Sequence, residues 1–338
     1  MRKRISTIFL NTVTFLLVFL CAGILADFCY SKFLPEGDSE GIVNWSCKNH
    51  SGSLIGGSES NCKGRWIKKN GAESFDTDFS TDAFGRRTVF DKIKKSASDT
   101  GLVLFFGGSD VLGKGVNDHE TIANQFFNLS DFAQVKNFGG PGFGPQQALE
   151  LLQFSDLKKE APADPVRNIS LFFYADAHVD RAVGSWSIAT EWGAHFPYYD
   201  LDSDDQLVFK GNFTSGGRYS HLQLMAKKSV LLNSLISEAS SYFSFSDADL
   251  RLTAKILVAI KSTFSAKYQN AQFYVVFGPT GVKSSSKMKN LLNEFGVKYL
   301  DYSKVWDPEN PATRTAEGHP SPLVYRLVAE QLAKDLKR

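Results

Sequence analysis

The sequence predicts an α/β fold in which a parallel sheet of about five strands is covered by helices on both faces. Two observations support this prediction. Short runs of apolar, β-branched and aromatic residues recur after residue 100, and such runs are typical of buried strands. Between the runs lie segments whose apolar residues recur at helical spacing. The runs are Leu102–Phe106, Gln134–Phe138 (the weakest), Ile169–Tyr174, Phe273–Phe277 and Val297–Leu300.

Two helical segments are the clearest. In the segment "DADLRLTAKILVAIKSTFSAKY" the apolar positions are Leu252, Ile256, Ala259, Ile260 and Phe264. In the last segment, Ser321 and Pro322 form an N-cap and first-turn pair, which predicts that a helix begins there. Its expected apolar stripe is Leu323, Leu327, Val328, Leu332 and Leu336.

The chain divides into three expected parts. Residues 1–30 are expected to be an anchor, residues 31–100 a stalk and lead-in, and residues 101–338 the folded domain. A stretch at about 180–224 interrupts the alternation of strands and helices and is interpreted as an insertion over one edge of the sheet. Its aromatic residues favour a small core of their own under a long loop, with stacking on sugar rings as the alternative. They are Trp186, Trp192, Phe196, Tyr198 and Tyr199.

The N-terminus has the pattern of a membrane anchor. The basic start Met1–Arg4 precedes the segment Ile8–Ala26, which is almost wholly apolar. Its length is close to the roughly 20 residues that a helix needs to cross a bilayer. We expect an uncleaved single-pass signal anchor, with a cleaved signal peptide as the alternative. The basic residues would stay cytoplasmic and place the domain outside, in a periplasmic or extracellular compartment.

Composition and cysteine usage agree with an exported globular domain. The 338 residues are 43% hydrophobic and 22% charged, and a net charge of only +2 gives no indication of nucleic-acid binding. Beyond the anchor region the only cysteines are Cys47 and Cys62. Their closeness in an exported loop favours a disulfide, with two unpaired thiols as the alternative. A zinc site is not expected, because His50 alone offers too few neighbouring ligands.

Residues suited to acyl transfer follow the predicted strands. Ser109 and Asp110 come directly after the first strand and two glycines, and the glycine-rich stretch 137–144 follows the second. The third strand leads into residues 174–178, and Glu317–His319 precedes the last helix. Ligands of such sheets bind at the carboxyl ends of the strands. The sequence therefore predicts a hydroxyl, an imidazole, a carboxylate and N–H donors at one rim, which nucleophilic acyl transfer needs.

These stretches resemble the four sequence blocks of the SGNH (GDSL-type) hydrolases. The matching stretches are "FFGGSDVLGKGVND", "NFGGPGFGPQQALELL", "FYADAHVDR" and "EGHPSPLVYRLVAEQLAKDL". Each block alone is a weak signal, whereas four in the right order are fairly specific. The resemblance spans roughly residues 100–338. It implies a flavodoxin-like three-layer sandwich, an acyl-serine mechanism and carboxylic-ester substrates, including acyl groups on sugars.

By this resemblance Ser109 would be the nucleophile and His319 the base, with the N–H groups of Ser109 and Gly142 facing the oxyanion. The chain departs from the family pattern twice. Where the family has an aspartate three residues before the histidine, this chain has Ala316, and Glu317 is the candidate replacement. Where the third block supplies an asparagine donor, this chain has Ala177. Either His178 replaces that donor, or the oxyanion hole has two donors.

The sequence thus predicts a serine esterase or acyltransferase that acts on acyl groups, such as acetyl, of an envelope or secreted polysaccharide. Asp110, Asn137 and Trp192 are the candidate substrate contacts. No metal or organic cofactor is called for. Two alternatives stay open. One is a lipase or lysophospholipase, which would suit a membrane location. The other is a non-catalytic polysaccharide-binding module, which would explain why alanines stand at the two departures, Ala316 and Ala177.

Overall fold

The computed structural model describes most of the chain beyond residue 58. The described residues are Gly23, 25–29, Lys32, 43–45, Cys47, 59–69, 74–90, 100–219, Leu224, 227–242, 245–278, 284–305, Asp307 and 309–337. They divide into two compact units, each of which is described by itself. The larger unit comprises Gly41–Arg218 with Phe245–Arg338, and the smaller comprises Met1–Glu40 with Tyr219–Ser244.

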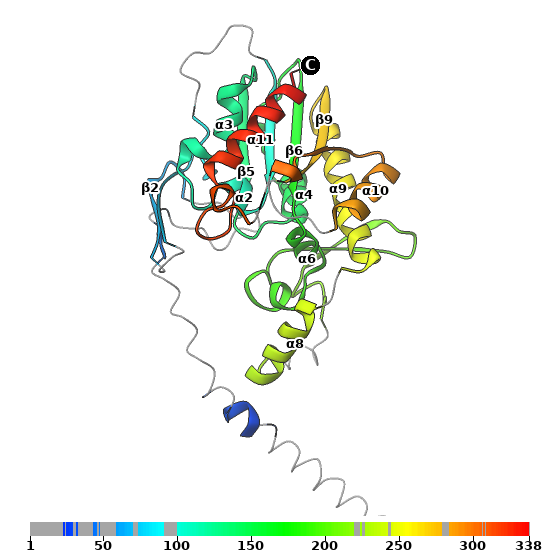
Figure 1. The fold of residues 1–338 in the computed structure, drawn as a ribbon. Coiled ribbons are helices and arrows are strands. Elements are labelled where there is room, and N and C mark those ends of the chain that lie inside the picture. The colour runs from blue at the N-terminus through cyan, green and yellow to red at the C-terminus, as the bar shows by residue number, and fades with distance from the viewer. Residues whose placement is uncertain are drawn as a thin grey trace, which may run out of the picture. The chain divides into compact units, whose positions relative to one another are not determined.

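A five-stranded sheet forms the centre of the larger unit (Figure 1). Its strands are β4 (Leu102–Gly107), β5 (Gln134–Gly139), β6 (Asn168–Tyr174), β9 (Ala271–Phe277) and β10 (Lys298–Asp301). They lie in the order β10-β9-β6-β4-β5, and every neighbouring pair is parallel. Counted along the chain this is the flavodoxin-like order 2-1-3-4-5. The predicted α/β fold with a five-stranded parallel sheet is confirmed, and each expected strand is present.

Helices cover both faces of this sheet, because the side chains of each strand alternate between two cores. In β4, Leu102, Leu104 and Phe106 belong to one core, and Val103 and Phe105 belong to the other. The first core is closed by α4 (Pro145–Phe154), α6 (Ala177–Val183), α9 (Asp247–Lys267) and α10 (Ser285–Glu294). The second is closed by α3 (Ile122–Leu129) and α11 (Pro322–Asp335). The remaining short elements of this unit are α2 (Ser109–Leu112), α5 (Leu157–Glu160), η2 (Asp118–Glu120), η4 (Ser303–Val305) and η5 (Pro311–Thr313).

The last helix begins at the expected residue, and Val328, Leu332 and Leu336 of its predicted stripe are buried, but the first two residues of the stripe are not. Ser321 is the N-cap of α11 and Pro322 its first residue. Leu323 and Leu327, which we expected in the buried stripe, are 48% and 39% exposed. The buried positions are Val324, Tyr325, Val328, Ala329, Leu332, Ala333 and Leu336. The stripe was wrong at its start because Tyr325, whose hydroxyl binds the chain near Ser109, turns the first helical turn toward the core.

Residues 43–80 differ from the expected stalk. They contain a three-stranded antiparallel sheet, β1 (Val43–Trp45), β2 (Lys63–Lys68) and β3 (Phe75–Ser80), within the larger unit. The disulfide Cys47–Cys62, the pairing that the sequence favours, ties the loop between β1 and β2. Cys47, Trp66 and Phe79 form a small core with Leu112 of α2. So few apolar residues build this core that the stretch shows little periodicity.

The insertion contains a two-stranded antiparallel hairpin, β7 (Pro197–Leu201) and β8 (Leu207–Asn212), preceded by the π-helix η3 (Ile188–Trp192). Four of the expected aromatic residues are buried: Trp186, Phe196, Tyr198 and Tyr199. Tyr199 packs in the main core of the sheet rather than in a core of the insertion. Trp192 and Phe209 are 48% and 45% exposed.

The smaller unit brings a helical turn at 25–29 beside the start of α8 (Val230–Tyr242). The Asp27 carboxylate accepts hydrogen bonds from the Ser229 hydroxyl and the Leu231 N–H. No helix in the described part of the chain is long and apolar enough to span a membrane. The predicted anchor segment lies almost wholly outside the described residues.

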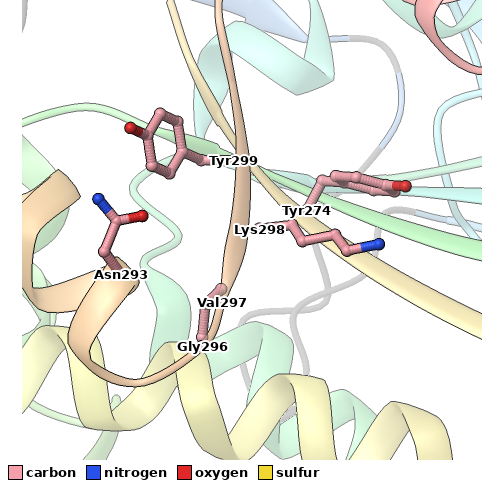
Figure 2. A pocket seen from close by; sticks show the side chains of 6 residues that line it. All are labelled: Tyr274, Asn293, Gly296, Val297, Lys298 and Tyr299. Carbon is pink, nitrogen blue, oxygen red and sulfur yellow. The ribbon is translucent and has the colours of Figure 1, made fainter.

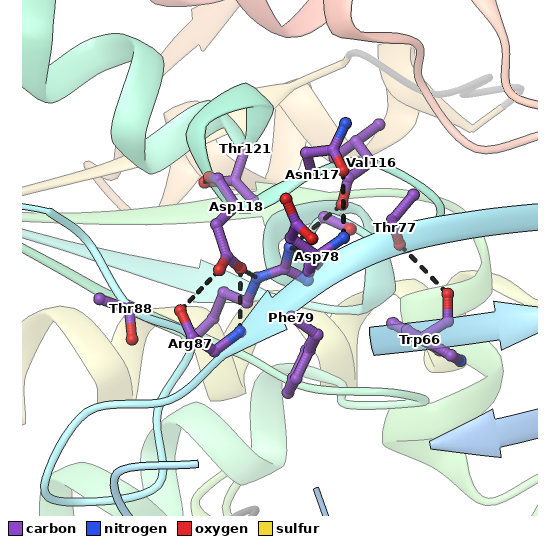
Figure 3. Close-up of polar contacts among 12 residues, drawn as sticks. Trp66, Thr77, Asp78, Phe79, Arg87, Thr88, Val116, Asn117, Asp118 and Thr121 are labelled. Atoms are coloured by element: carbon purple, nitrogen blue, oxygen red, sulfur yellow. Dashed lines mark hydrogen bonds and ion pairs between the residues drawn. The ribbon is translucent and has the colours of Figure 1, made fainter. Parts of the chain in front are cut away.

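A buried ion pair fastens the lead-in chain to the segment that follows α2. The Arg87 side chain is fully buried, and its Nε lies 2.6 Å from Asp118 Oδ1. Arg87 also donates to the carbonyl oxygens of Asp78 and Val116, while the Ser80 N–H and hydroxyl donate to Asp118. Figure 3 shows the guanidinium enclosed by these groups above Phe79. This network joins β3 to residues 116–118, which follow α2 in the chain.

We expect Arg87→Met to lower the free energy of unfolding by about 3–5 kcal/mol, because Asp118 would remain as a buried charge without its partner. Arg65→Met is the matched control. Arg65 pairs with Asp76 and Asp78 on the surface at half exposure, so its loss should cost far less than the loss of Arg87. Urea unfolding of the two variants measures both values, and equal losses would show that burial of the Arg87 pair does not matter.

Candidate active site

Ser109 begins α2 at the carboxyl end of β4, and three contacts fix this turn. The Tyr325 hydroxyl donates to the Asp110 carbonyl at 2.6 Å, and the Asn137 amide donates to the Val111 carbonyl at 2.8 Å. Gly139 provides the third, because a Cβ there would lie 2.3 Å from the Leu112 nitrogen. The glycine therefore lets the end of β5 pack directly against the backbone of α2.

His319 reaches the nucleophile from a tight turn before α11. The Arg314–Pro320 bridge closes this turn, Gly318 occupies it with φ +77°, and the His319 N–H donates to the Thr315 hydroxyl. The result is a distance of 2.9 Å between His319 Nε2 and Ser109 Oγ. Burial of the imidazole holds its pKa below the ordinary 6.5. At neutral pH the ring is therefore uncharged and can accept the Ser109 proton.

Glu317 makes other contacts than the expected one to His319. Its carboxylate lies 2.6 Å from the Lys68 ammonium and 3.0 Å from that of Lys114. Among the described residues no hydrogen bond joins Glu317 to His319, and Nδ1 of the buried imidazole has no hydrogen-bond partner there. The structure thus presents a serine–histidine pair and places the nearby acid between two lysines. Nothing in the sequence pattern indicated Lys68, which lies 249 positions from Glu317.

The backbone N–H groups of Ser109 and Gly142 are the expected oxyanion donors. Within the described part of the chain, neither the Ser109 nor the Gly142 N–H donates a hydrogen bond. Gly142 has φ +71°, and a Cβ there would lie 2.5 Å from the Trp192 ring. Glycine is therefore needed at this position both for its backbone conformation and for the contact with Trp192.

His178 supplies a third donor close to these two. The Ala175 N–H donates to His178 Nδ1, so the ring proton of the neutral imidazole resides on Nε2. Nε2 is buried without a hydrogen-bond partner among the described residues, and it lies 3.2 Å from the point that a Cβ on Gly108 would occupy. Burial lowers the pKa of His178 well below 6.5, and the charge of Arg181 adds to this. The Nε2–H thus remains a neutral donor beside the nucleophile.

Arg181 is a residue of this site that sequence reasoning missed. Its Nη1 donates to the Phe143 carbonyl at 2.8 Å and lies 2.7 Å from where a Cβ on Gly108 would be. The guanidinium thus fills the space beside Gly108, and a side chain at that position would have to displace it. Burial lowers the pKa of Arg181, and the negative charges of Asp110 and Asp180 oppose that change.

The three candidate substrate contacts differ in how accessible their side chains are. Asn137 is 1% exposed, donates to Val111 and accepts from the Gly139 N–H, so its contacts are those of a structural residue. Asp110 is partly buried, which raises its pKa, while the charges of His319 and Arg181 oppose that rise. Trp192 presents a half-exposed ring against Gly142. Trp192 therefore has the best access to a substrate at the rim.

One hollow of about 450 Å³ lies away from this site. Figure 2 shows that it straddles the edge strand β10, with Tyr274 and Lys298 on one side and Tyr299 and Asn293 on the other. Its residues lie at the start of β10, whereas Ser109 lies at the carboxyl edge of the sheet. A second hollow of about 350 Å³ is lined by residues 311–318 of the histidine loop, including Arg314 and Thr315.

Comparison with known proteins finds likeness in structure only. No family model and no curated protein matches the sequence. An acetyl xylan esterase from the rumen bacterium Butyrivibrio proteoclasticus matches with a TM-score of 0.41 and 10% identity, over 70% of this chain and 63% of that one. A G-D-S-L lipolytic protein from Desulfitobacterium hafniense gives 0.35 and 14%, over 70% and 99%. A carbohydrate acetylesterase from Sinorhizobium meliloti gives 0.40 and 10%, over 70% and 97%. Similarity at this level does not establish a family or an activity.

The lowered pKa of His319 has a measurable consequence. We expect the reaction of Ser109 with a fluorophosphonate to slow as the pH falls, with a midpoint below 6.5, because only the neutral imidazole can take the serine proton. The labelling rate between pH 4.5 and 8 measures this midpoint. A midpoint above 6.5 would show that neighbouring acids outweigh burial.

Proposed function

We propose that this protein is a serine esterase or acyltransferase that acts on ester-linked acyl groups of a polysaccharide. The observation that carries the proposal is the contact of 2.9 Å between Ser109 Oγ and His319 Nε2 at the carboxyl edge of the sheet. A hydroxyl beside a neutral, buried imidazole is the arrangement from which an activated nucleophile arises. Three unpartnered N–H donors beside the serine support acyl transfer rather than another reaction.

In the proposed mechanism, Ser109 Oγ attacks the ester carbonyl while His319 Nε2 takes its proton. The carbonyl oxygen becomes an oxyanion, which accepts hydrogen bonds from the N–H groups of Ser109 and Gly142 and from His178 Nε2. The C–O bond to the alcohol then breaks, and the imidazolium returns the proton to the departing alcohol. Water or a second sugar hydroxyl then gives its proton to His319 and attacks the acyl-serine carbonyl. The bond between the acyl carbon and Ser109 Oγ breaks, the imidazolium returns the proton to Oγ, and the acid or the new ester is released.

Trp192 is the feature that favours a carbohydrate. It ends the π-helix η3, in which Glu191 has the unusual backbone angles φ −121° and ψ −107°. π-helical turns and unusual backbone angles are frequent at functional sites. Phe196 supports the indole edge-on, and Gly142 contacts it, so the exposed part of the ring adjoins the oxyanion donors. A half-exposed indole fixed in this way is suited to pack on the apolar face of a sugar ring.

We further propose that the chain is anchored to a membrane through Ile8–Ala26, with the catalytic unit outside the cytoplasm. The support is the length and apolarity of this segment behind a basic start. A disulfide in the larger unit agrees with an oxidising compartment. Membrane fractionation of the full chain against a chain that begins after residue 30 tests the anchor, and equal solubility of the two would contradict it.

Fluorophosphonate labelling of the full chain tests the nucleophile. We expect wild type to be labelled at Ser109, Ser109→Ala not to be labelled, and His319→Ala to be labelled at least about 1,000-fold more slowly, because the base is lost. Peptide mapping identifies the labelled residue. Ser284→Ala is a control that should be labelled normally, since Ser284 binds Asp176 and Tyr174. A folded wild type without label would favour the binding-module alternative.

The proposed sugar contact is tested with Trp192→Ala and Trp192→Phe. For an acetylated oligosaccharide we expect Trp192→Ala to lower kcat/KM about tenfold or more, because a stacking surface worth about 1–2 kcal/mol is lost. For p-nitrophenyl acetate, which lacks the sugar, the loss should be less than about threefold, and Trp192→Phe should recover part of the difference. Equal losses on both substrates, or a preference for long acyl chains, would favour the lipase alternative.

A further inference from the structure

We propose that Glu317 forms a clamp with Lys68 and Lys114 that positions His319 against Ser109, instead of acting as the acid that binds the imidazole. Glu317, Lys68 and Lys114 are positioning residues. Their role in catalysis rests on the proposed function. The clamp has two consequences: it fixes the histidine loop, and it offsets the charge that Glu317 would otherwise exert on the imidazole.

The clamp is a nearly buried carboxylate held at both oxygens. The Glu317 side chain is 7% exposed, and those of Lys68 and Lys114 are 17% and 29% exposed. Oε1 lies 2.6 Å from one ammonium and Oε2 lies 3.0 Å from the other. These two lysines lower the pKa of Glu317 against the effect of burial. The carboxylate therefore stays ionised at neutral pH, where the imidazole is uncharged, and the clamp is present there.

The three residues come from three segments that otherwise lie far apart in the sequence. Lys68 ends β2 of the N-terminal sheet, and Glu317 occupies the turn that carries His319. Lys114 lies on the nucleophile turn, where its own N–H donates to the Ser109 carbonyl at 3.0 Å. Through Lys114 the clamp connects the histidine loop to the backbone of Ser109. It therefore acts on the relative position of the two reacting side chains.

The charged groups around the imidazole predict how each variant should change the pKa of His319. Asp110 and Glu317 raise the pKa of His319, while Lys114 and Arg181 lower it, and burial exceeds all of these. Lys68 faces Glu317 rather than the imidazole. Two ammonium groups on one carboxylate leave no net negative charge at the clamp. Removal of a lysine should thus raise the pKa of His319, and removal of Glu317 should lower it.

The test is the imidazole pKa of His319, measured by NMR on the full chain with labelled histidine and assigned with His319→Gln. We expect Lys114→Met to raise this pKa by about half a unit or more and Glu317→Gln to lower it by a similar amount. Lys68→Met should raise it less, because Lys68 acts only through Glu317. In the double variant Lys68→Met/Glu317→Gln the contribution of Lys68 should vanish.

The position of His319 relative to Ser109 is tested separately, by the rate at which a fluorophosphonate labels Ser109. The rate is measured at pH 8, where the imidazole is neutral in every variant. We expect Glu317→Gln to lower this rate about tenfold and Lys114→Met to lower it less, while Lys114→Arg should retain the wild-type rate and pKa. Lys63→Met is the matched control, because Lys63 is exposed at the other end of β2. Thermal unfolding of each variant identifies any that fails to fold, and if Glu317→Gln is one of them, Lys114→Met carries the test.

The possible outcomes separate the clamp from the proposed function. A loss of about 10⁴-fold in Glu317→Gln with no effect of the lysine variants would identify Glu317 as a triad acid and overturn the clamp. An unchanged pKa of His319 in both Lys114→Met and Glu317→Gln would also overturn it. If wild type is not labelled at Ser109, the proposed function fails, whereas the NMR titration still decides whether the clamp exists.

Discussion

The carboxyl edge of the parallel sheet is the constraint on which the site depends. Because β4, β5 and β6 run in the same direction, the turns that follow them meet at one rim. Those turns carry Ser109, Gly142 and His178. The order β10-β9-β6-β4-β5 puts β4 between β5 and β6, so Ser109 lies between the two segments that carry the proposed oxyanion donors. The site thus follows from topology before any side-chain contact is considered.

The sheet alone does not place the base, which depends on chain outside the α/β core. His319 lies on a turn, and that turn contacts the N-terminal sheet through Lys68. The N-terminal sheet is itself fastened by the buried Arg87–Asp118 pair and by its small core with Leu112. A segment that contributes no catalytic residue thereby supports both the nucleophile turn and the histidine loop. This dependence explains why residues 43–90 pack with the catalytic unit instead of forming a free stalk.

The sequence was sufficient where one local pattern determines the structure. All five strands of the sheet, the start of α11 and the pairing of Ser109 with His319 follow from apolar runs, a cap and block order. It was insufficient where the structure depends on contacts between distant residues. Glu317 was expected at the imidazole because of its spacing, but the lysine that holds it is 249 positions away. Arg181 was missed because its role depends on the space beside Gly108, which becomes visible only when the helices are packed.

The two departures from the resembling family have different physical outcomes. At the position of the missing amide, a backbone N–H fixes the His178 tautomer and leaves Nε2–H as a neutral donor, which suits the oxyanion role that we propose for it. At the imidazole the missing aspartate has no such replacement, since Glu317 is shared by two lysines. The charges of Asp110 and Glu317 still raise the pKa of His319, and the charge of Asp110 also acts on Arg181. Under the proposed function, transition-state stabilisation would therefore depend more on the oxyanion donors than on an acid behind the histidine.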